Sequence, residues 1–319
     1  MLQQTKPLID IEGEKMAAKI AVAIPCYNEE AAIAGVVNDF KRVLPGADIY
    51  VFDNNSTDRS EKLAQAAGAK IVKVFKRGKG NVMRAIFDYI VTDALIVVDG
   101  DGTYCADEAL ALLEPVLNGC VDMVVGDRLK RATGKAFTKI NKFGNHLIVK
   151  TINFVFRTSY EDIVSGYRVF SRRFVENIPL LTPGFETETE LTLQALQEGF
   201  EITEVPISYV PRDGKSKSKL RPFTDGWRIM ITMAILLRDH YPLRIYGFIG
   251  MVFLLLALTG CVLRLLYFYG IRSLPTEVLN GMIIFFTPLG ITVLGIGLIL
   301  SAVNCRLREI KQIMLRRKG

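Results

Sequence analysis

The sequence predicts an α/β fold with a mostly parallel sheet, followed by two C-terminal transmembrane helices. Between residues 19 and 126, short apolar runs alternate with segments of helical periodicity, as in repeated β-α-β units. Polar motifs follow several of these runs, at the strand ends where open α/β sheets bind ligands. Apolar residues make up 50% of the 319 residues and are concentrated after about Tyr241. The composition therefore separates a mixed α/β body from an apolar C-terminal part.

Five short apolar runs are predicted to be strands. They are β-branched and almost continuously apolar, as expected of parallel strands covered on both faces. The predicted strands are Lys19–Pro25, Asp48–Asp53, Lys70–Phe75, Ala94–Asp99 and Asp122–Gly126. The stretches between them predict helices near Glu29–Val43, Asp58–Ala67, Gly80–Val91 and Ala106–Leu117.

Two long segments near the C-terminus carry no charged residue. Ile245–Leu263 has 19 residues and Val278–Val303 has 26, and about 20 apolar residues cross the core of a bilayer. They are predicted to form a transmembrane hairpin, the alternative being two buried helices of a soluble protein. The chain after the second span contains six cations (Arg306, Arg308, Lys311, Arg316, Arg317 and Lys318) and one acid, Glu309. The positive-inside rule places this tail in the cytoplasm, and a hairpin then places the preceding body there too.

These features predict five parts of the chain. They are an N-terminal extension at 1–18, a catalytic body at 19–221, a juxtamembrane helix at 222–242, the hairpin at 243–305 and a basic cytoplasmic tail at 306–319. The first 19 residues are polar and mixed in charge, so no signal peptide is expected. The predicted location is the inner or plasma membrane, with both termini cytoplasmic. The apolar stretch Trp227–Leu237 is expected at the interface or in a contact between copies of the chain.

The charge balance favours an acidic partner. Forty basic and 33 acidic residues give a net charge of +7, which suits a phosphorylated substrate or an anionic lipid. The sequence shows no RNA- or DNA-binding motif, so no nucleic-acid partner is expected. Five scattered cysteines without a C-x-x-C pair, together with two histidines, argue for reduced thiols and against a zinc site.

The sequence Asp99-Gly100-Asp101 directly follows a predicted strand. Two carboxylates two residues apart at a strand end can meet one hard divalent cation, which also accepts diphosphate oxygens. The pattern predicts an Mg²⁺ or Mn²⁺ site on Asp99 and Asp101. An acidic turn without a metal is the alternative interpretation.

Two other polar motifs follow the first and second predicted strands. In Pro25–Glu30, Tyr27 offers a ring face on which a nucleobase can stack, and Glu29 can accept a hydrogen bond from the base or ribose. The alternative is an ordinary strand–turn–helix junction in which Asn28 caps the helix. The motif that begins at Asp53 could form hydrogen bonds to a nucleobase, or it could form an Asx-type turn and a helix cap. A fourth segment, 78–81, is interpreted mainly as a helix-start turn, with Lys79 near the nucleotide.

Taken in order, the motifs resemble glycosyltransferase family 2 with a GT-A fold. The motifs that carry this resemblance are PCYNEE at 25–30, FDNNSTD at 52–58, VVDGDG at 97–102 and VVGDRL at 124–129. Three later segments resemble the dolichol-phosphate-mannose-synthase-like branch, and the hairpin is typical of its bacterial polyprenyl-phosphate members. These segments are D-x-x-S-G-Y-R at 162–168, the acidic stretch at 184–191 and the R-x-x-G-x-S-K-L-like loop at 211–220. The resemblance covers residues 19–220.

The resemblance implies a role for each matching residue. Donor binding is implied for Pro25, Tyr27, Glu29, Asp53, Asp99, Gly100, Asp101 and Lys219. Acceptor binding is implied for Ser165, Arg168 and Arg212, and a catalytic role for Asp101, Arg128 and Arg212. Arg128, Arg212 and Lys219 would meet the donor or acceptor phosphate. Thr103 departs from the family pattern, because it stands where dolichol-type members carry a glutamine ligand.

The implied reaction is inverting transfer of a sugar from a nucleotide sugar, with UDP favoured, to a polyprenyl phosphate of the undecaprenyl type. A divalent cation and nearby arginines would neutralise the departing diphosphate. A phosphate monoester, with a second pKa of about 6, is already largely ionised at neutral pH and needs no strong general base. The identity of the sugar stays open.

Residues 135–157 predict a basic amphipathic helix suited to an anionic membrane surface. Its basic or polar positions are Lys135, Lys139, Lys142, His146, Lys150, Asn153 and Arg157. The alternative is a helix packed on the body with a solvated charged face.

Two rival functions differ in their motifs. A processive family 2 synthase, or one with another acceptor, is the nearer rival, but the Q-x-x-R-W motif of processive enzymes is absent, since the single tryptophan, Trp227, follows Thr224-Asp225-Gly226. A non-catalytic membrane scaffold is disfavoured by the intact Asp99, Asp101, Arg128 and Arg212.

Overall fold

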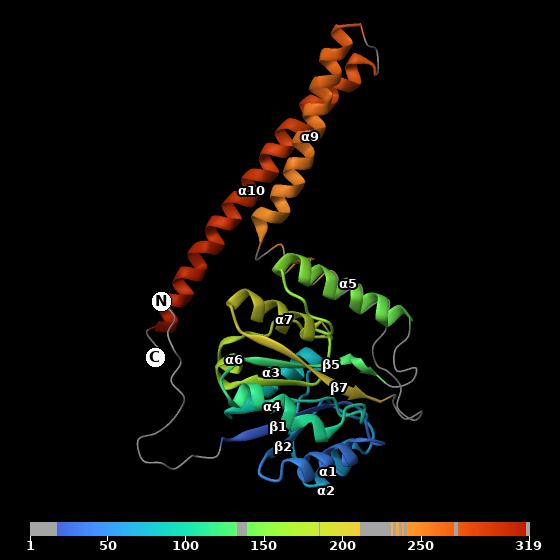
Figure 1. The fold of residues 1–319 in the computed structure, drawn as a ribbon, viewed down its shortest axis with the longest axis vertical. Helices are drawn as coiled ribbons and strands as arrows, with labels where there is room; N and C mark the ends of the chain where they lie inside the picture. The colour runs from blue at the N-terminus through green and yellow to red at the C-terminus, as the bar shows by residue number, and fades with distance from the viewer. Residues whose placement is uncertain are drawn as a thin grey trace. The chain divides into compact units, whose positions relative to one another are not determined.

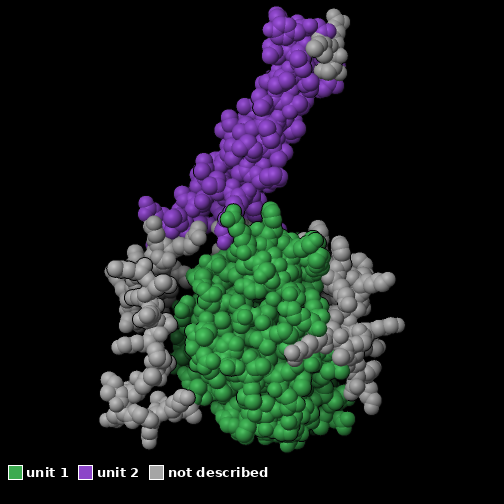
Figure 2. All heavy atoms as spheres, viewed as in Figure 1, with its two compact units in different colours: residues 1–232 green, residues 233–319 purple. Residues whose placement is uncertain are grey.

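The computed structural model describes residues 18–132, 139–184, 186–210, 241–270 and 274–316, with a few positions between 231 and 238. The side chains of residues 131–144, 308, 309 and 311–316 are outside this description. The chain divides into two compact units, residues 1–232 and 233–319, coloured green and purple in Figure 2.

The first unit is built on a seven-stranded sheet of order β3-β2-β1-β4-β6-β5-β7. Its strands are β1 (Ile20–Cys26), β2 (Asp48–Asp53), β3 (Lys70–Lys73), β4 (Ala94–Val97), β5 (Met123–Ala132), β6 (Arg168–Ser171) and β7 (Ile202–Tyr209). All pairs are parallel except those of β6, which lies antiparallel between β4 and β5. The predicted α/β fold with a mostly parallel sheet is confirmed, and each of the five predicted strands is present.

Helices cover both faces of this sheet (Figure 1). They are α1 (Ile33–Val43), α2 (Ser60–Ala66), α3 (Lys79–Tyr89), the short 3₁₀ helix η1 (Ala106–Glu108), α4 (Ala109–Leu117), α5 (Lys139–Phe156), α6 (Arg172–Asn177) and α7 (Thr187–Glu198). Successive side chains of a strand point to opposite faces, so β1 contributes Val22 and Ile24 to one core and Ala21 and Ala23 to the other. The first core takes the apolar faces of α1, α2 and α4, and the second those of α3, α6 and α7.

The strand register brings the polar motifs to one edge of the sheet. Cys26 at the end of β1 pairs with Asp53 at the end of β2, and Ala23 of β1 pairs with Val97 at the end of β4. Because these three neighbouring strands are parallel, the segments that follow them leave the sheet side by side. This edge is where the candidate site lies.

The helix expected from Glu29 begins only at Ile33. Asn28 has a left-handed backbone (φ 53°), and its side chain gives no N-cap to this helix, whose N-cap residue is Ala32. The Asn28 side chain instead bonds to the loop after β2. The possibility that Asn28 caps the helix is therefore wrong.

The second unit contains α9 (Pro242–Phe268) and α10 (Thr276–Arg316), which pack side by side, with the C-terminal part of the longer α10 extending past α9 (Figure 1). A Cβ atom on Gly250 would come within 3.0 Å of the Gly290 carbonyl oxygen, so the helices meet backbone to backbone there. The segments Pro242–Phe268 and Thr276–Leu307 are long and apolar enough to cross a membrane, judged by length and composition, and an 18-residue stretch of each has a mean hydropathy of 2.4. Both predicted spans lie inside them.

Candidate active site

The loops after β1 and β2 are joined by hydrogen bonds. The Thr57 N–H donates to Asn28 Oδ1 at 2.8 Å, and the Asn28 N–H donates to Ser56 Oγ at 3.0 Å. The Glu29 N–H donates to Ser60 Oγ at 2.7 Å. Asparagine tolerates the left-handed backbone that Asn28 adopts here. These bonds explain the polar residues of both motifs and hold Tyr27 and Glu29 at the sheet edge.

Asp53 is the buried carboxylate of this edge, with 4% of its surface exposed. One of its oxygens, Oδ2, accepts from the Ser56 N–H at 3.2 Å, whereas Oδ1 has no hydrogen-bond partner among the residues that the structure describes. A buried polar atom without a partner is costly unless a ligand or water satisfies it. This orphaned oxygen is consistent with the predicted role of Asp53 in donor binding.

The ring of Tyr27, which is predicted to stack on a nucleobase, contacts Arg77, a residue that the sequence did not predict for the site. The guanidinium carbon of Arg77 lies 4.7 Å from the centroid of its ring, within the range of a cation–π contact. Arg77 comes from the segment between β3 and α3, so the third strand also contributes to this edge. The sequence feature that could have predicted this role is the position of Arg77 in a basic turn, two residues before Lys79.

Asp99 is held by Lys79, whose side chain is only 13% exposed. Lys79 Nζ lies 2.6 Å from Asp99 Oδ1 and 2.6 Å from Glu188 Oε1 on α7. Burial opposes the charged form of Lys79, but the attraction of Asp99 and then of Glu188 outweighs it and raises the lysine pKa. Gly166 makes the arrangement possible, because a Cβ atom there would fall 2.3 Å from Asp99 Oδ2. The ion pairs join three separate motifs of the sequence.

Asp101 faces an open cleft of about 320 Å³ whose walls include Ala32, Gly35, Gly102 and Tyr104. Its Oδ1 accepts two hydrogen bonds from Thr103, at 2.6 Å from the hydroxyl and 3.1 Å from the backbone N–H. Thr103, which is 1% exposed, therefore orients Asp101 instead of facing the cleft as a ligand. This gives a role to the residue at which the sequence departs from the dolichol-type pattern.

The donor set at Asp99 and Asp101 fits a hard divalent cation. Carboxylate oxygens are the ligands that Mg²⁺ and Mn²⁺ prefer, and these cations commonly complete their shell with phosphate oxygens and water. Among the described residues there is no cluster of three or more His, Cys, Asp or Glu side chains that would enclose a metal. The two carboxylates therefore suit a cation that is bound together with a diphosphate.

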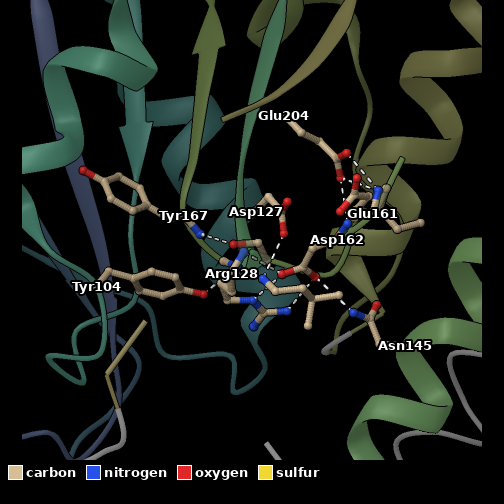
Figure 3. A network of polar contacts seen from close by, with 12 residues as sticks. Tyr104, Asp127, Arg128, Asn145, Glu161, Asp162, Tyr167 and Glu204 are labelled. Carbon is tan, nitrogen blue, oxygen red and sulfur yellow. Dashed lines mark hydrogen bonds and ion pairs between the residues drawn. The ribbon is translucent and has the colours of Figure 1, made fainter. Parts of the chain in front are cut away.

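Arg128 forms a bidentate ion pair with Asp162 (Figure 3). Its Nε and Nη2 donate to the two carboxylate oxygens at 2.7 and 2.9 Å, and its guanidinium carbon lies 5.4 Å from the centroid of the Tyr209 ring. Burial opposes both charges, but their mutual attraction outweighs it, raising the pKa of Arg128 and lowering that of Asp162. The Tyr209 ring lies 5.3 Å from the Tyr104 ring, centroid to centroid, and the Tyr104 hydroxyl accepts from the N–H of Gly166, the residue that packs against Asp99. These contacts connect the ion pair to the aspartate motif.

Ser165 and Arg168 are buried, with 0% and 2% of their surfaces exposed. Arg168 Nε donates to the Ser165 carbonyl at 2.9 Å, Nη1 to Thr192 Oγ1 at 3.2 Å and Nη2 to the Glu188 carbonyl at 3.0 Å. Burial lowers the pKa of Arg168 to about 10, against the attraction of Glu188. These contacts give Arg168 a structural role inside the body, and the acceptor-binding role expected for Ser165 and Arg168 stays a prediction. Arg212 and Lys219 lie outside the described residues.

Comparison with known proteins decides the family. The sequence model described as "Glycosyl transferase family 2" matches residues 21–178. Glycosyltransferase AglJ of Haloferax volcanii is 33% identical over 299 residues, which span 92% of this chain and 98% of the relative. The chain belongs to glycosyltransferase family 2. It is therefore a glycosyltransferase, as the ordered motifs predicted.

Two further proteins resemble this chain, one in sequence and one in fold. A dolichyl-phosphate hexose transferase of Haloferax volcanii is 28% identical over 65% of this chain and 89% of its own length. Glucosyl-3-phosphoglycerate synthase of Mycobacterium tuberculosis, solved with Mn²⁺, UDP-glucose and phosphoglyceric acid, superposes with a TM-score of 0.57 at 21% identity. The superposition covers 69% of this chain and 79% of that one. The structural likeness confirms the predicted GT-A fold.

Proposed function

We propose that this glycosyltransferase moves a sugar from a nucleotide sugar, with UDP favoured, to a polyprenyl phosphate of the undecaprenyl type, with inversion at the anomeric carbon. The observation that carries the proposal is the presence in one chain of Asp99 and Asp101 at the carboxyl edge of the sheet and of two helices long and apolar enough to cross a membrane. A donor site on the body and a membrane hairpin suit an acceptor whose tail stays in lipid. The dolichyl-phosphate hexose transferase among its relatives supports a lipid phosphate as acceptor.

The nucleoside would lie over the loops after β1 and β2. Pro25, Tyr27 and Glu29 line the end of β1, and the orphaned Asp53 oxygen offers a hydrogen-bond acceptor at the end of β2. Asp99, Gly100 and Asp101 follow β4 and would meet the ribose and diphosphate. This order along the sheet edge is consistent with a nucleotide that lies across the ends of three parallel strands.

The leaving diphosphate develops negative charge, which the site must neutralise. Asp99 and Asp101 would hold Mg²⁺ or Mn²⁺, which would supply that neutralisation when bound; the Mn²⁺ and UDP-glucose of the structural neighbour support this choice. Asp101 is oriented by Thr103, and Asp99 is restrained by Lys79. Arg128, Arg212 and Lys219 are the cations that we assign to the donor and acceptor phosphates.

The acceptor phosphate would attack without a strong general base. A phosphate monoester has a second pKa of about 6, so it is largely a dianion at neutral pH. Arg128 is permanently charged and its side chain is 13% exposed, with its guanidinium held by Asp162, so it can hold a phosphate oxygen in a fixed orientation. The residues of the site then act by binding and orienting the two phosphates.

Helix α5 supports a surface that contacts lipid. Ile148, Val149 and Ile152 are buried, whereas Phe154 is 87% exposed. His146, Leu147, Lys150 and Arg157 are also exposed, so basic and apolar side chains share the solvent side. A solvated helix face gains nothing from an exposed phenylalanine, but an interfacial helix does. We propose that α5 lies on the cytoplasmic membrane surface.

We further propose the predicted division of the chain, with the body at 19–221, a juxtamembrane helix at 222–242 and a cytoplasmic tail at 306–319. Its basis is the charge asymmetry around the hairpin. Thiol labelling of a cysteine introduced at position 318 tests the orientation. Labelling from the outside of intact cells would contradict it.

The decisive experiment is transfer by the purified full-length protein with a panel of nucleotide sugars and undecaprenyl phosphate. We expect one UDP-sugar to give a lipid-phosphate-linked sugar, chelation to stop the reaction and Asp101→Ala to abolish it while the protein stays folded. Asp107→Ala is the matched control, since Asp107 is an exposed carboxylate paired with Arg42 outside the site. Transfer to another acceptor, or near-normal turnover by Asp101→Ala, would contradict the proposal.

A further inference from the structure

The position of Arg128 depends on Asp162. The carboxylate accepts from Nε and Nη2 of the guanidinium and, at 3.2 Å, from the Arg128 backbone N–H. Two parallel bonds to one carboxylate fix both the place and the plane of a guanidinium, and they use two of its five N–H groups. Asp162 is 0% exposed, so water cannot replace these contacts when one is lost.

The same carboxylate is tied to α5. Asn145, on this helix, donates from its amide nitrogen to Asp162 Oδ1 at 3.2 Å. Figure 3 shows Asn145 and Arg128 meeting the Asp162 carboxylate from different elements. Because Oδ1 also accepts from Arg128 Nη2, one oxygen atom connects the helix to the guanidinium.

The backbone of this loop is fixed from its other side. The Glu204 carboxylate, on β7, accepts from the Glu161 N–H at 2.8 Å and from the Asp162 N–H at 2.7 Å. The loop that carries Asp162 is therefore anchored to the sheet. A displacement of α5 at Asn145 must then be taken up by the Asp162 side chain and the guanidinium that it holds.

We propose that Asp162 is a positioning residue that couples α5 to Arg128. Through this coupling, contact of α5 with the lipid surface orients Arg128 toward the acceptor phosphate. The inference rests on the proposed function, because it assumes a lipid-phosphate acceptor and an interfacial α5. Enzymes lose about 10²-fold in rate when a reacting group is misplaced by 1 Å, so a link of two hydrogen bonds is enough to matter.

Asparagine variants on α5 separate this coupling from general stabilisation. Asn153 is the matched control, because it also joins α5 to the following loop, with its Nδ2 donating to the Tyr160 carbonyl and its Oδ1 accepting from Thr158 and Tyr160. Those contacts do not include Asp162 or Arg128. Asn145→Ala removes the donor to Asp162, and Asn145→Asp keeps the size but sets a carboxylate against the Asp162 carboxylate.

The measurement is the steady-state transfer rate of the full-length enzyme in vesicles containing undecaprenyl phosphate, with each substrate varied in turn. Asn145→Ala removes a hydrogen bond to a charged group, and such a bond contributes about 1.5–3 kcal/mol. We therefore expect about a tenfold rise in KM for the lipid phosphate with this variant. We expect a larger rise with Asn145→Asp and a nucleotide-sugar KM within about twofold of wild type in both. Asn153→Ala should lower the melting temperature at least as much but leave the lipid-phosphate KM within twofold.

A double-mutant cycle of Asn145→Ala with Arg128→Lys completes the test, since Lys cannot form the bidentate pair. Non-additive effects on the lipid-phosphate KM support the coupling, and additive effects overturn it. Equal changes in both substrate constants, or parallel behaviour of the Asn145 and Asn153 variants, would also overturn it. Failure of the proposed function looks different, because the wild-type protein would then transfer no sugar to lipid phosphate at all.

Discussion

Lys79 Nζ lies 2.6 Å from both Asp99 Oδ1 and Glu188 Oε1, so one buried ammonium group joins α3, the end of β4 and α7. Two carboxylates this close would repel each other in a site of low dielectric without a cation between them. The lysine therefore offsets the repulsion between the Asp99 and Glu188 carboxylates.

Lys79→Met should destabilise the body strongly. Removing one partner of a buried ion pair leaves an uncompensated charge, at a cost of about 3–5 kcal/mol. The matched control is Lys73→Met, because Lys73 pairs with Glu61 on the surface, where an ion pair contributes about 0–1 kcal/mol. Thermal unfolding in detergent measures both variants, and equal melting temperatures would show that the buried pair contributes no more than the surface pair.

Thr103→Val should weaken metal binding without unfolding the protein. The variant keeps the backbone bond to Asp101 Oδ1 but loses the hydroxyl bond at 2.6 Å. Loss of a group that orients a metal ligand typically costs about 10–100-fold in affinity. Titration with Mn²⁺ in the presence of UDP, followed by electron paramagnetic resonance, measures it. Thr92→Val, which removes a buried hydroxyl bond to the Lys19 carbonyl, is the control and should leave the titration unchanged.

Gly166→Ala should damage the site through Asp99. The new methyl group would fall 2.3 Å from Asp99 Oδ2, so the carboxylate or the backbone must move. We expect a loss of about 10²-fold in turnover, as for other misplaced groups. Gly46→Ala, where nothing lies within 4 Å of the added atom, should retain wild-type turnover. Normal activity in the Gly166 variant would mean that Asp99 need not occupy its present position.

Acid should destabilise the wild-type body partly through Asp162. Burial alone would raise the pKa of this carboxyl, but Arg128 outweighs burial and lowers it below the ordinary value of 3.8. A lowered folded-state pKa contributes stability that is present above the unfolded pKa and lost as the pH falls toward the folded one. The melting temperature of Asp162→Asn should therefore depend less steeply on pH below about pH 4 than that of wild type. Parallel curves for the two proteins would contradict this assignment.

Neutralising the basic stripe of α5 should affect the lipid substrate alone. Each Lys or Arg near an anionic surface contributes about 1 kcal/mol, so replacing Lys139, Lys142, Lys150 and Arg157 by Gln should cost several kcal/mol of attraction. The expected result is a raised KM for polyprenyl phosphate with little change for the nucleotide sugar. High salt should reproduce part of it, since screening acts beyond about 10 Å at 0.1 M. Unchanged lipid kinetics would identify the stripe as a solvated face.

The strands, the helices and the hairpin could be predicted because their signals are local. Each of the five apolar runs became a strand, and both uncharged segments lie within helices long enough to span a bilayer. The motifs at 25–30, 52–58 and 97–102 also follow neighbouring parallel strands, as repeated β-α-β units require. Residue periodicity and turn chemistry suffice for such features, since they depend on residues close in sequence.

Which side chains contact the site residues could not be predicted from the sequence, because these contacts depend on the tertiary structure. Lys79 and Glu188 are more than one hundred residues apart, and β6, at 168–171, lies between β4 and β5 in an order that no local pattern specifies. That insertion places Gly166 against Asp99, and the same segment buries Ser165 and Arg168, which the motif alone had suggested for the acceptor. A sequence motif records which side chains are present. Whether a charged side chain faces a ligand or neutralises a neighbour is decided by which distant charges the fold brings within about 3 Å and removes from water.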